Sequence, residues 1–454
     1  MRAPAEGAAG DAGAGRTDAV TGLAAGKAGG AGGAGPEPYD VVTLGRVGVD
    51  LYPEQSGVGL AEVRSFAKYL GGTAANVAVA GARLGLRTAL LSGVGPDPFG
   101  GYVRAALDAF GVGTGLLATV PDTQTPVVFC ELFPPDDFPL HFYRRPVAPD
   151  QCLTPGMLAE PAAAAAVRGA RALWITGSAL AVEPTRSAVF AALELRAGGE
   201  VWFDLDWRPG FWADPAQAPA LYARALAYAT LAVGNREEVE VAVGSADPET
   251  AAGLLLERGV RTAVVKQGPA GALARTAAGE LCVAPPVAVK VVNGLGAGDA
   301  FGGALCAGLL AGDPLPDVLR AANAAGALVA SRLACADAMP TRPEIEAALR
   351  EQAAEPGGPL PAPAAGAVPK GSARPSATGA GRAEGTTAPP VTDGGPGRDD
   401  TDPPAGRAAD AAPPRTTGTG PAEGTTAPPV TDAGRAAGPG AGGGSAGRAA
   451  GGAG

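Results

Sequence analysis

The segment from Pro285 to Gly312 (PPVAVKVVNGLGAGDAFGGALCAGLLAG) constrains the fold of this chain more than any other. Its β-branched run at 287–292 predicts a strand, the glycines from Gly294 to Gly298 predict a turn, and the apolar residues that follow predict a helix opening at Asp299. A helix start attracts anions through its unpaired N–H groups and aligned peptide dipoles, and glycines let an anion approach those groups closely. We therefore predict an anion-binding helix N-terminus here.

Asp299 stands where its carboxylate would repel a bound anion, so its presence needs a compensating gain. One interpretation is a general base that takes a proton from a hydroxyl as the hydroxyl attacks a phosphorus atom held by the N–H groups. The alternative is that Asp299 only caps the helix, since aspartate is a favoured N-cap residue. The small residues that follow (Gly302, Gly303 and Ala304) and the apolar run before the turn favour a phosphoryl-transfer site.

Composition limits the folded part of the 454-residue chain to its middle. Residues 1–37 are mostly Ala and Gly with scattered charge, and residues 361–454 contain no Leu, Ile, Phe, Trp, Tyr, Met or Cys. Such segments bury too little apolar surface to offset the entropy of the chain. We expect disordered extensions at 1–37 and 351–454, and one large α/β domain at 38–350.

Charge and residue usage argue against several classes of function. A formal net charge of −10 gives no reason to expect nucleic acid or an anionic membrane as a partner. No charge-free apolar window of about 18 residues predicts a membrane span, and no apolar signal segment opens the chain, so we expect a cytoplasmic protein. Five widely spaced cysteines without a CxxC pair, and a single histidine, argue against disulfides, zinc and a Ser-His-Asp triad.

Two early turns carry polar residues suited to a hydroxylated ligand. Asp50 follows the predicted first strand, 39–47, at the edge where ligands bind in open α/β sheets, although a solvated turn residue is an equal alternative. Gly71 and Gly72 predict a strand-to-helix turn, and Asn76 on the first turn of that helix offers both a donor and an acceptor. Together these residues predict a pocket the size of a polyol.

The segment 125–145 (TPVVFCELFPPDDFPLHFYRR) interrupts the alternation of strands and helices. Two β-rich runs flank a Pro–Pro–Asp–Asp turn, which predicts a hairpin in a small lid sheet, with further lid strands near 51–70. Tyr143, Arg144 and Arg145 close the segment, and an aromatic residue beside paired arginines suits a substrate carboxylate. Surface salt bridging is the alternative that the residues alone slightly favour.

From residue 171 onward the chain alternates between apolar strands and helices. This alternation predicts a doubly wound, mostly parallel sheet flanked by helices. The predicted strands lie at 172–176, 200–206, 231–233 and 262–266. The predicted helices lie near 184–196, 219–228, 248–258, 317–333 and 344–350.

Four motifs, taken in order, resemble the ribokinase-like (PfkB) family of carbohydrate kinases over roughly residues 40–347. They are the GG…N turn, NREE, VKQGPAG and GAGDAF. The resemblance implies a ribokinase-like α/β fold with a small β-sheet lid, ATP and Mg²⁺ as cofactors, and a monovalent cation as an option. Within the family, GRVGVDLYPEQ, FPPDDFPLHFYR, FDLDWRPGFW and VGNREEVEVAVG are similar to the 5-dehydro-2-deoxygluconokinases of myo-inositol breakdown.

The resemblance also implies roles for individual residues. The general base is Asp299, beside the phosphoryl-binding N–H groups of Gly296, Ala297 and Gly298. The residues expected at the sugar-acid hydroxyls are Asp50, Gly71, Gly72 and Asn76. The residues expected at the substrate carboxylate are Tyr143, Arg144 and Arg208. The residues expected at the nucleotide are Asn235, Glu238 (through water to Mg²⁺), Lys266, Gly268 and Gly271.

One position departs from the family pattern. The family commonly has an Asp-Thr pair ahead of the glycines, whereas this chain has Asn293, Gly294 and Leu295. The dehydrodeoxygluconokinase group resembles this chain in carrying Asn there, so the departure is a subfamily character. It puts in doubt any monovalent-cation site that the Asp would help to build.

The resemblance implies that ATP phosphorylates the terminal hydroxyl of 5-dehydro-2-deoxy-D-gluconate. Kinases for 2-keto-3-deoxygluconate, fructose or ribose remain alternatives, as does a sugar-acid sensor without turnover. Arg144 and Arg208 favour an acid, because desolvating paired arginines without a counter-anion is costly. Lid strands in this family often pair into dimers, so a homodimer through the lid is a further expectation.

Overall fold

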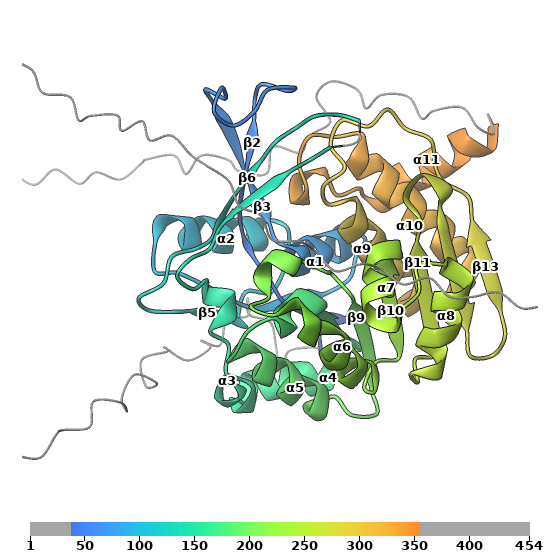
Figure 1. Cartoon of the computed structure of the whole chain (residues 1–454), viewed down its shortest axis with the longest axis horizontal. Coiled ribbons are helices and arrows are strands. Elements are labelled where there is room, and N and C mark those ends of the chain that lie inside the picture. Colours follow the sequence, from blue (N-terminus) through green and yellow to red (C-terminus); the bar gives the residue numbers. More distant parts are fainter. Residues whose placement is uncertain (1–37, 136, 355–454) are drawn as a thin grey trace, which may run out of the picture. The chain divides into compact units, whose positions relative to one another are not determined.

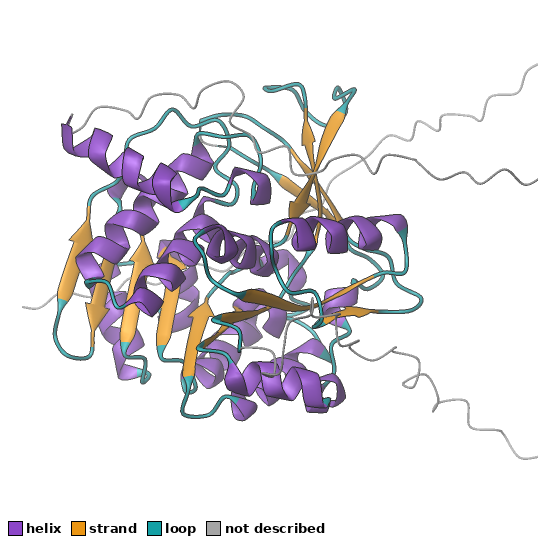
Figure 2. Ribbon diagram, turned by 180° about the vertical axis from the view of Figure 1, so that it is seen from behind, coloured by secondary structure: helices purple, strands orange, loops and turns teal. Residues whose placement is uncertain are grey.

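A nine-stranded, mostly parallel sheet forms the centre of the structure (Figures 1 and 2). The structure is a computed structural model that describes residues 38–135 and 137–354. Of the extensions predicted at 1–37 and 351–454, residues 351–354 instead form the end of the last helix, and the rest lies outside the described residues. No helix of the described part is long and apolar enough to cross a membrane.

The strands of the central sheet lie in the order β13-β12-β11-β10-β9-β8-β1-β4-β5. Neighbouring strands are parallel except for the antiparallel pairs β11–β12 and β12–β13. The confirmed prediction of a doubly wound sheet follows from strands buried on both faces, which read as continuous apolar runs. The strand bounds are β1 (Val41–Leu44), β4 (Thr88–Val94), β5 (Leu117–Thr119), β8 (Ala172–Thr176), β9 (Glu200–Asp204), β10 (Leu231–Asn235), β11 (Thr262–Lys266), β12 (Ala272–Thr276) and β13 (Leu281–Ala284).

Helices cover both faces of this sheet, with one apolar core on each side (Figure 2). The first core includes α1 (Thr73–Arg83), α2 (Pro98–Ala109), α9 (Ala297–Ala311), α10 (Leu315–Ala330) and α11 (Arg342–Ala354). The second core includes α3 (Pro155–Ala159), α4 (Pro161–Gly169), α5 (Thr185–Leu195), α6 (Ala218–Leu226), α7 (Arg236–Val243) and α8 (Pro248–Glu257).

Small residues let α9 approach α1 and the sheet closely. A Cβ on Gly303 would lie 2.2 Å from the Cβ of Ala80 in α1. A Cβ on Gly302 would lie 2.9 Å from the ring of Trp174 in β8. These two glycines therefore serve helix packing, and they bring the first turns of α1 and α9 side by side.

A second, four-stranded sheet in the order β3-β2-β6-β7 stands apart from the central sheet, at the top of Figure 1. Its strands are β2 (Gly48–Pro53), β3 (Phe66–Gly71), β6 (Val127–Cys130) and β7 (Leu140–Tyr143). The antiparallel pair β6–β7 confirms the predicted hairpin, and β2 joins the two halves of the sheet by pairing with both β3 and β6. We call this sheet the lid.

One predicted strand is absent, and another is shorter than expected. Residues 287–292 form no strand: β13 ends at Ala284, before the two prolines, and the N–H groups of Val292 and Asn293 donate to the carbonyl of Ala330 at the end of α10. The predicted strand 39–47 ends early, at Leu44. Asp50 consequently lies inside lid strand β2 and not at the end of the first central strand.

Candidate active site

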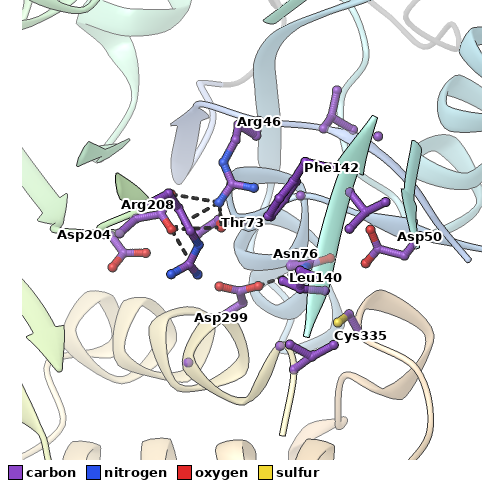
Figure 3. A pocket seen from close by; sticks show the side chains of 18 of the residues that line it. Arg46, Asp50, Thr73, Asn76, Leu140, Phe142, Asp204, Arg208, Asp299 and Cys335 are labelled. Carbon is purple, nitrogen blue, oxygen red and sulfur yellow. Dashed lines mark hydrogen bonds and ion pairs between the residues drawn. The ribbon is translucent and has the colours of Figure 1, made fainter. Parts of the chain in front are cut away.

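A cavity of about 270 Å³ opens between the lid and the carboxyl ends of the central strands. Its lining comes from lid strands β2, β6 and β7, from central strands β9, β10 and β11, and from the first turns of α1 and α9. Figure 3 shows Asp299 and Asn76 at its centre, Arg46 and Arg208 on one side, and Asp50 and Cys335 on the other. Most of the residues predicted from the sequence therefore meet in one place.

The turn before α9 has the form that an anion-binding helix start requires. Gly296 caps the helix with a φ of 80°, and a Cβ there would lie 2.8 Å from the Cys335 sulfur, so only glycine fits. Gly298 lines the cavity together with Gly296, and Ala297 between them is the first helical residue. The predicted glycine turn and helix start are present although the predicted strand before them is not.

Asn293 holds this turn in place. Its side chain is fully buried, its Nδ2 donates to the carbonyl oxygen of Leu333 at 2.6 Å, and its Oδ1 accepts from the N–H of Leu295 at 3.0 Å. The amide thus links the turn to the loop after α10 with one donor and one acceptor. A carboxylate at this position would turn an oxygen towards the Leu333 carbonyl.

Asp299 has the environment of a proton acceptor. Its Oδ2 accepts a hydrogen bond from Asn76 Nδ2 at 2.7 Å. Burial raises the pKa of Asp299 to about 6, and the Asn76 hydrogen bond opposes that rise. The other amide atom, Asn76 Oδ1, is buried and has no hydrogen-bond partner among the described residues, so it is free to accept from a ligand hydroxyl.

Asp50 and the glycine pair form the opposite side of the cavity. A Cβ on Gly71 would lie 2.0 Å from Asp50 Oδ1, so the carboxylate occupies the space that a larger residue would fill. Gly72 has a φ of 102° and approaches the Arg46 carbonyl oxygen, which would lie 2.5 Å from a Cβ. Burial raises the pKa of Asp50 to about 7, with Arg46 opposing and Asp299 adding to the rise.

An ionic cluster that the sequence did not reveal forms one wall. Asp206 accepts from Arg46 Nη2 at 3.0 and 3.1 Å and from the Ser178 hydroxyl, and Arg208 Nη2 lies 3.3 Å away. Arg46 also donates to Ser178 and Thr73. Burial would raise the pKa of Asp206, but the two guanidinium groups outweigh it and lower the pKa, so Asp206 stays ionised.

The lid contributes Arg144 but not Tyr143. Arg144 lines the cavity, donates to Asp150 Oδ2 at 2.7 Å and lies over the ring of Phe211 at 4.5 Å. Tyr143 is 66% exposed on the outer face of the lid, contrary to its predicted place at the substrate. Side chains alternate along a strand, so Phe142 lines the cavity in its place.

Asn235 and Glu238 line the cavity and cap α7 reciprocally. Asn235 Oδ1 accepts from the Glu238 N–H at 2.9 Å, and Glu238 Oε2 accepts from the Asn235 N–H at 2.6 Å. Lys266, at the end of β11, also reaches the cavity. Gly268 and Gly271 lie in the turn between β11 and β12, outside the cavity lining, and a Cβ on Gly271 would lie 2.1 Å from the Ala284 carbonyl oxygen.

A buried carboxylate at a glycine-rich helix start, under a β-sheet lid on a doubly wound sheet, is the arrangement of the ribokinase-like sugar kinases. The chain belongs to the pfkB family of carbohydrate kinases, whose sequence pattern matches residues 39–342. The kinases of this family use ATP and Mg²⁺.

Individual relatives agree with this assignment. The chain is 34% identical to a 5-dehydro-2-deoxygluconokinase from Geobacillus thermodenitrificans (strain NG80-2), over 68% of this chain and 93% of that protein. A fructokinase double mutant from Vibrio cholerae O395, solved with fructose, ADP and potassium ion, is 30% identical with a TM-score of 0.61. A protein from E. coli described as a ribokinase II, solved with ATP and Mg²⁺, is 26% identical with a TM-score of 0.63. Both solved chains match over 69% of this chain and 99% of their own length.

Proposed function

We propose that the protein transfers the terminal phosphoryl group of ATP to the terminal hydroxyl of 5-dehydro-2-deoxy-D-gluconate, in the cytoplasm where ATP is supplied. The observation that carries this proposal is one cavity that combines the base Asp299 with the arginines Arg144 and Arg208. Arg46 and Arg208 share the single carboxylate of Asp206, so a neutral sugar would leave one of these two guanidinium charges unbalanced. The relative from Geobacillus thermodenitrificans supports the same choice of substrate.

In the proposed reaction Asp299 takes the proton of the attacking hydroxyl. Its pKa of about 6 leaves it ionised at neutral pH, yet basic enough to accept a proton during transfer. Asn76 orients the carboxylate through its Nδ2, and its free Oδ1 accepts from the sugar. The N–H groups at Gly296, Ala297 and Gly298 stabilise the negative charge of the phosphoryl group as it moves.

The donor set on the nucleotide side fits Mg²⁺ held through water. Asp204 and Glu238 supply carboxylates to this side of the cavity, and Asn235 adds an amide. No group of three or more His, Cys, Asp or Glu side chains converges as a direct metal site within residues 38–135 and 137–354. Mg²⁺ prefers oxygen ligands and keeps several waters, and it neutralises charge on the phosphate oxygens. We propose that Glu238 meets it through water, with Asn235 alongside.

The substrate carboxylate is assigned to Arg208, with Arg144 as the second cation. Arg208 is 38% exposed, and within the described part of the chain it forms an ion pair with Asp206 at 3.3 Å. Arg144 is already paired with Asp150 at 2.7 Å and is nearly buried. It therefore attracts the substrate carboxylate through its electric field more than through direct contact. The cation–carboxylate contact sets the preference for an acid over a neutral sugar.

A substrate panel tests this proposal. ADP release would be measured with Mg·ATP and 5-dehydro-2-deoxygluconate, 2-keto-3-deoxygluconate, fructose or ribose, for the native protein and for Arg208→Leu. We expect the first acid to be preferred, and Arg208→Leu to raise its KM about tenfold or more while a neutral sugar is unaffected. A preference for fructose or ribose would overturn the sugar-acid assignment and keep the kinase. Saturable binding without turnover would favour a sensor.

We also propose that the outer face of the lid pairs with a second copy of the chain. Phe66, Phe129 and Tyr143 form a row of edge-to-face rings there, with centroid distances of 5.3 and 5.1 Å. Leu51 and Val127 border the same hollow on this face. Sedimentation of the native protein and of Tyr143→Glu tests this: a dimer that the substitution dissociates is expected, and a native monomer at micromolar concentration would refute it.

A further inference from the structure

Lys266 is a charged side chain inside the cavity that the mechanism above leaves without a chemical task. It ends β11, opposite Asn235 of β10, and its side chain is 18% exposed. Its Nζ lies 3.8 Å from Asp204 Oδ1 and 3.7 Å from Glu238 Oε2. Lys266, from β11, and Asp299, from α9, line the same cavity.

The ammonium group lies beside the first turn of α9. A Cβ built on Gly298 would be 3.3 Å from Lys266 Nζ. This end of a helix carries partial positive charge, and a cation is unfavourable there. An anion bound between Lys266 and the start of α9 would be attracted by both positive groups.

The two carboxylates hold Lys266 without using up its donors. Distances of 3.7 and 3.8 Å are longer than a hydrogen bond, and Glu238 Oε2 already accepts from the Asn235 N–H at 2.6 Å. A lysine ammonium carries three N–H donors, so Lys266 keeps donors to spare for a ligand.

We propose that Lys266 is a catalytic residue that donates to the oxygens of the phosphoryl group during its transfer, and that Asp204 and Glu238 are its positioning residues. In that step the hydroxyl oxygen of the sugar bonds to the γ-phosphorus while the bond from phosphorus to the β–γ bridging oxygen breaks. The hydroxyl proton goes to Asp299, and the bond electrons leave with ADP. Lys266 gains and loses no proton. The proposal rests on the phosphoryl transfer of the family and not on the choice of sugar.

A purely structural role predicts something different. If Lys266 only neutralised Asp204, removing both charges together would restore the site. The matched set is therefore Lys266→Met, Asp204→Asn and the double variant, each assayed for kcat, for KM of both substrates and for thermal midpoint. The acceptor is whichever sugar the native protein phosphorylates fastest.

We expect Lys266→Met to lower kcat by about 10²–10³-fold with little change in either KM, as for loss of one donor to a transition state. Its thermal midpoint should fall, because Asp204 and Glu238 lose their counter-ion. The double variant should regain part of the midpoint, because only Glu238 then lacks its counter-ion, but it should not regain kcat. Recovery of kcat in the double variant, or a change confined to the KM for ATP, would overturn the proposal.

A second measurement does not need a sugar at all. Calorimetry would compare binding of Mg·ADP with and without fluoroaluminate, a planar anion that resembles a phosphoryl group in transfer. The native protein should bind the fluoroaluminate complex more tightly than Mg·ADP alone, and Lys266→Met should lose that gain. An unchanged gain would refute the role of Lys266 even if every sugar in the panel failed.

Discussion

The hydrogen bond from Asn76 to Asp299 makes the pH dependence of the enzyme predictable. A donor aimed at a carboxylate stabilises its ionised form and lowers its pKa. Removing the donor therefore raises the pKa, and the base is lost at a higher pH on acidification. We choose Asn76→Leu because leucine is similar in size and leaves little room for a water in place of the amide.

The size of the shift follows from the contact. A buried hydrogen bond of 2.7 Å to a charged group contributes about 1.5–3 kcal/mol, which is about 1–2 pKa units. The pKa of Asp299 should move from about 6 to about 7–8. At pH 7 the ionised fraction would then fall from about nine-tenths to between about one half and one tenth.

The assay is the profile of kcat/KM between pH 5 and 9, which reports the free enzyme. Thr73→Val is the control, because Thr73 lines the same cavity but bonds to Arg46 and not to Asp299. Asp50, with a pKa of about 7, titrates in the same range, so the difference between variants is the test. An acid limb that stays in place in Asn76→Leu would refute the reasoning, as would an equal shift in Thr73→Val.

Two further variants test turnover and stability. Asp299→Asn should lower kcat by about 10²–10⁴-fold. The pKa of Asp299 is raised from 3.8 to about 6 in the folded protein. Keeping the buried carboxylate ionised therefore lowers the unfolding free energy above pH 6, and this cost shrinks as the pH falls towards 3.8. The same variant should thus gain up to about 3 kcal/mol of unfolding free energy at pH 8 and about half of that at pH 5, measured by urea titration; no gain would contradict the burial of the carboxylate. Gly303→Ala places a Cβ 2.2 Å from that of Ala80 and should lower the unfolding free energy by about 1–3 kcal/mol, whereas an unchanged urea midpoint would show that α1 and α9 separate freely.

The sequence predicts the central sheet because its strands are buried on both faces. Runs such as Ala172–Thr176 are wholly apolar or small, and the structure buries every residue in them. The turn before α9 was equally predictable, since Gly296 and Asp299 act within a few residues of each other. Local patterns succeed where the forces that decide the structure are local.

The failures share a non-local cause. The β-branched residues at 287–292 were expected to form a strand. Instead, the N–H groups of Val292 and Asn293 donate to the carbonyl of Ala330, some forty positions along the chain. Tyr143 was placed on the wrong face because only the pairing of β7 with β6 fixes which of two successive side chains points inward. Neither fact is readable from the segment itself.

The ionic cluster is the clearest omission. Arg46 and Asp206 are separated by 160 positions, so no spacing rule connects them. Asp204 could have been predicted in the same way as Asp50, from the rule that ligands bind at the carboxyl ends of parallel strands. It ends a buried parallel strand at that edge of the sheet. Asp206 follows two positions later, so the same rule applied to β9 would have indicated this side of the cavity.

The division of the cavity between two sheets has a consequence for how such enzymes diversify. Asp50, Leu140 and Phe142 line the cavity from the lid, whereas Asp299 and Lys266 line it from the central sheet and its helices. Mutations in the lid can therefore alter which acceptor is admitted while the transfer machinery stays intact. Acceptor specificity can therefore evolve through substitutions in one small sheet, and protein engineering can change it by exchanging that sheet between relatives.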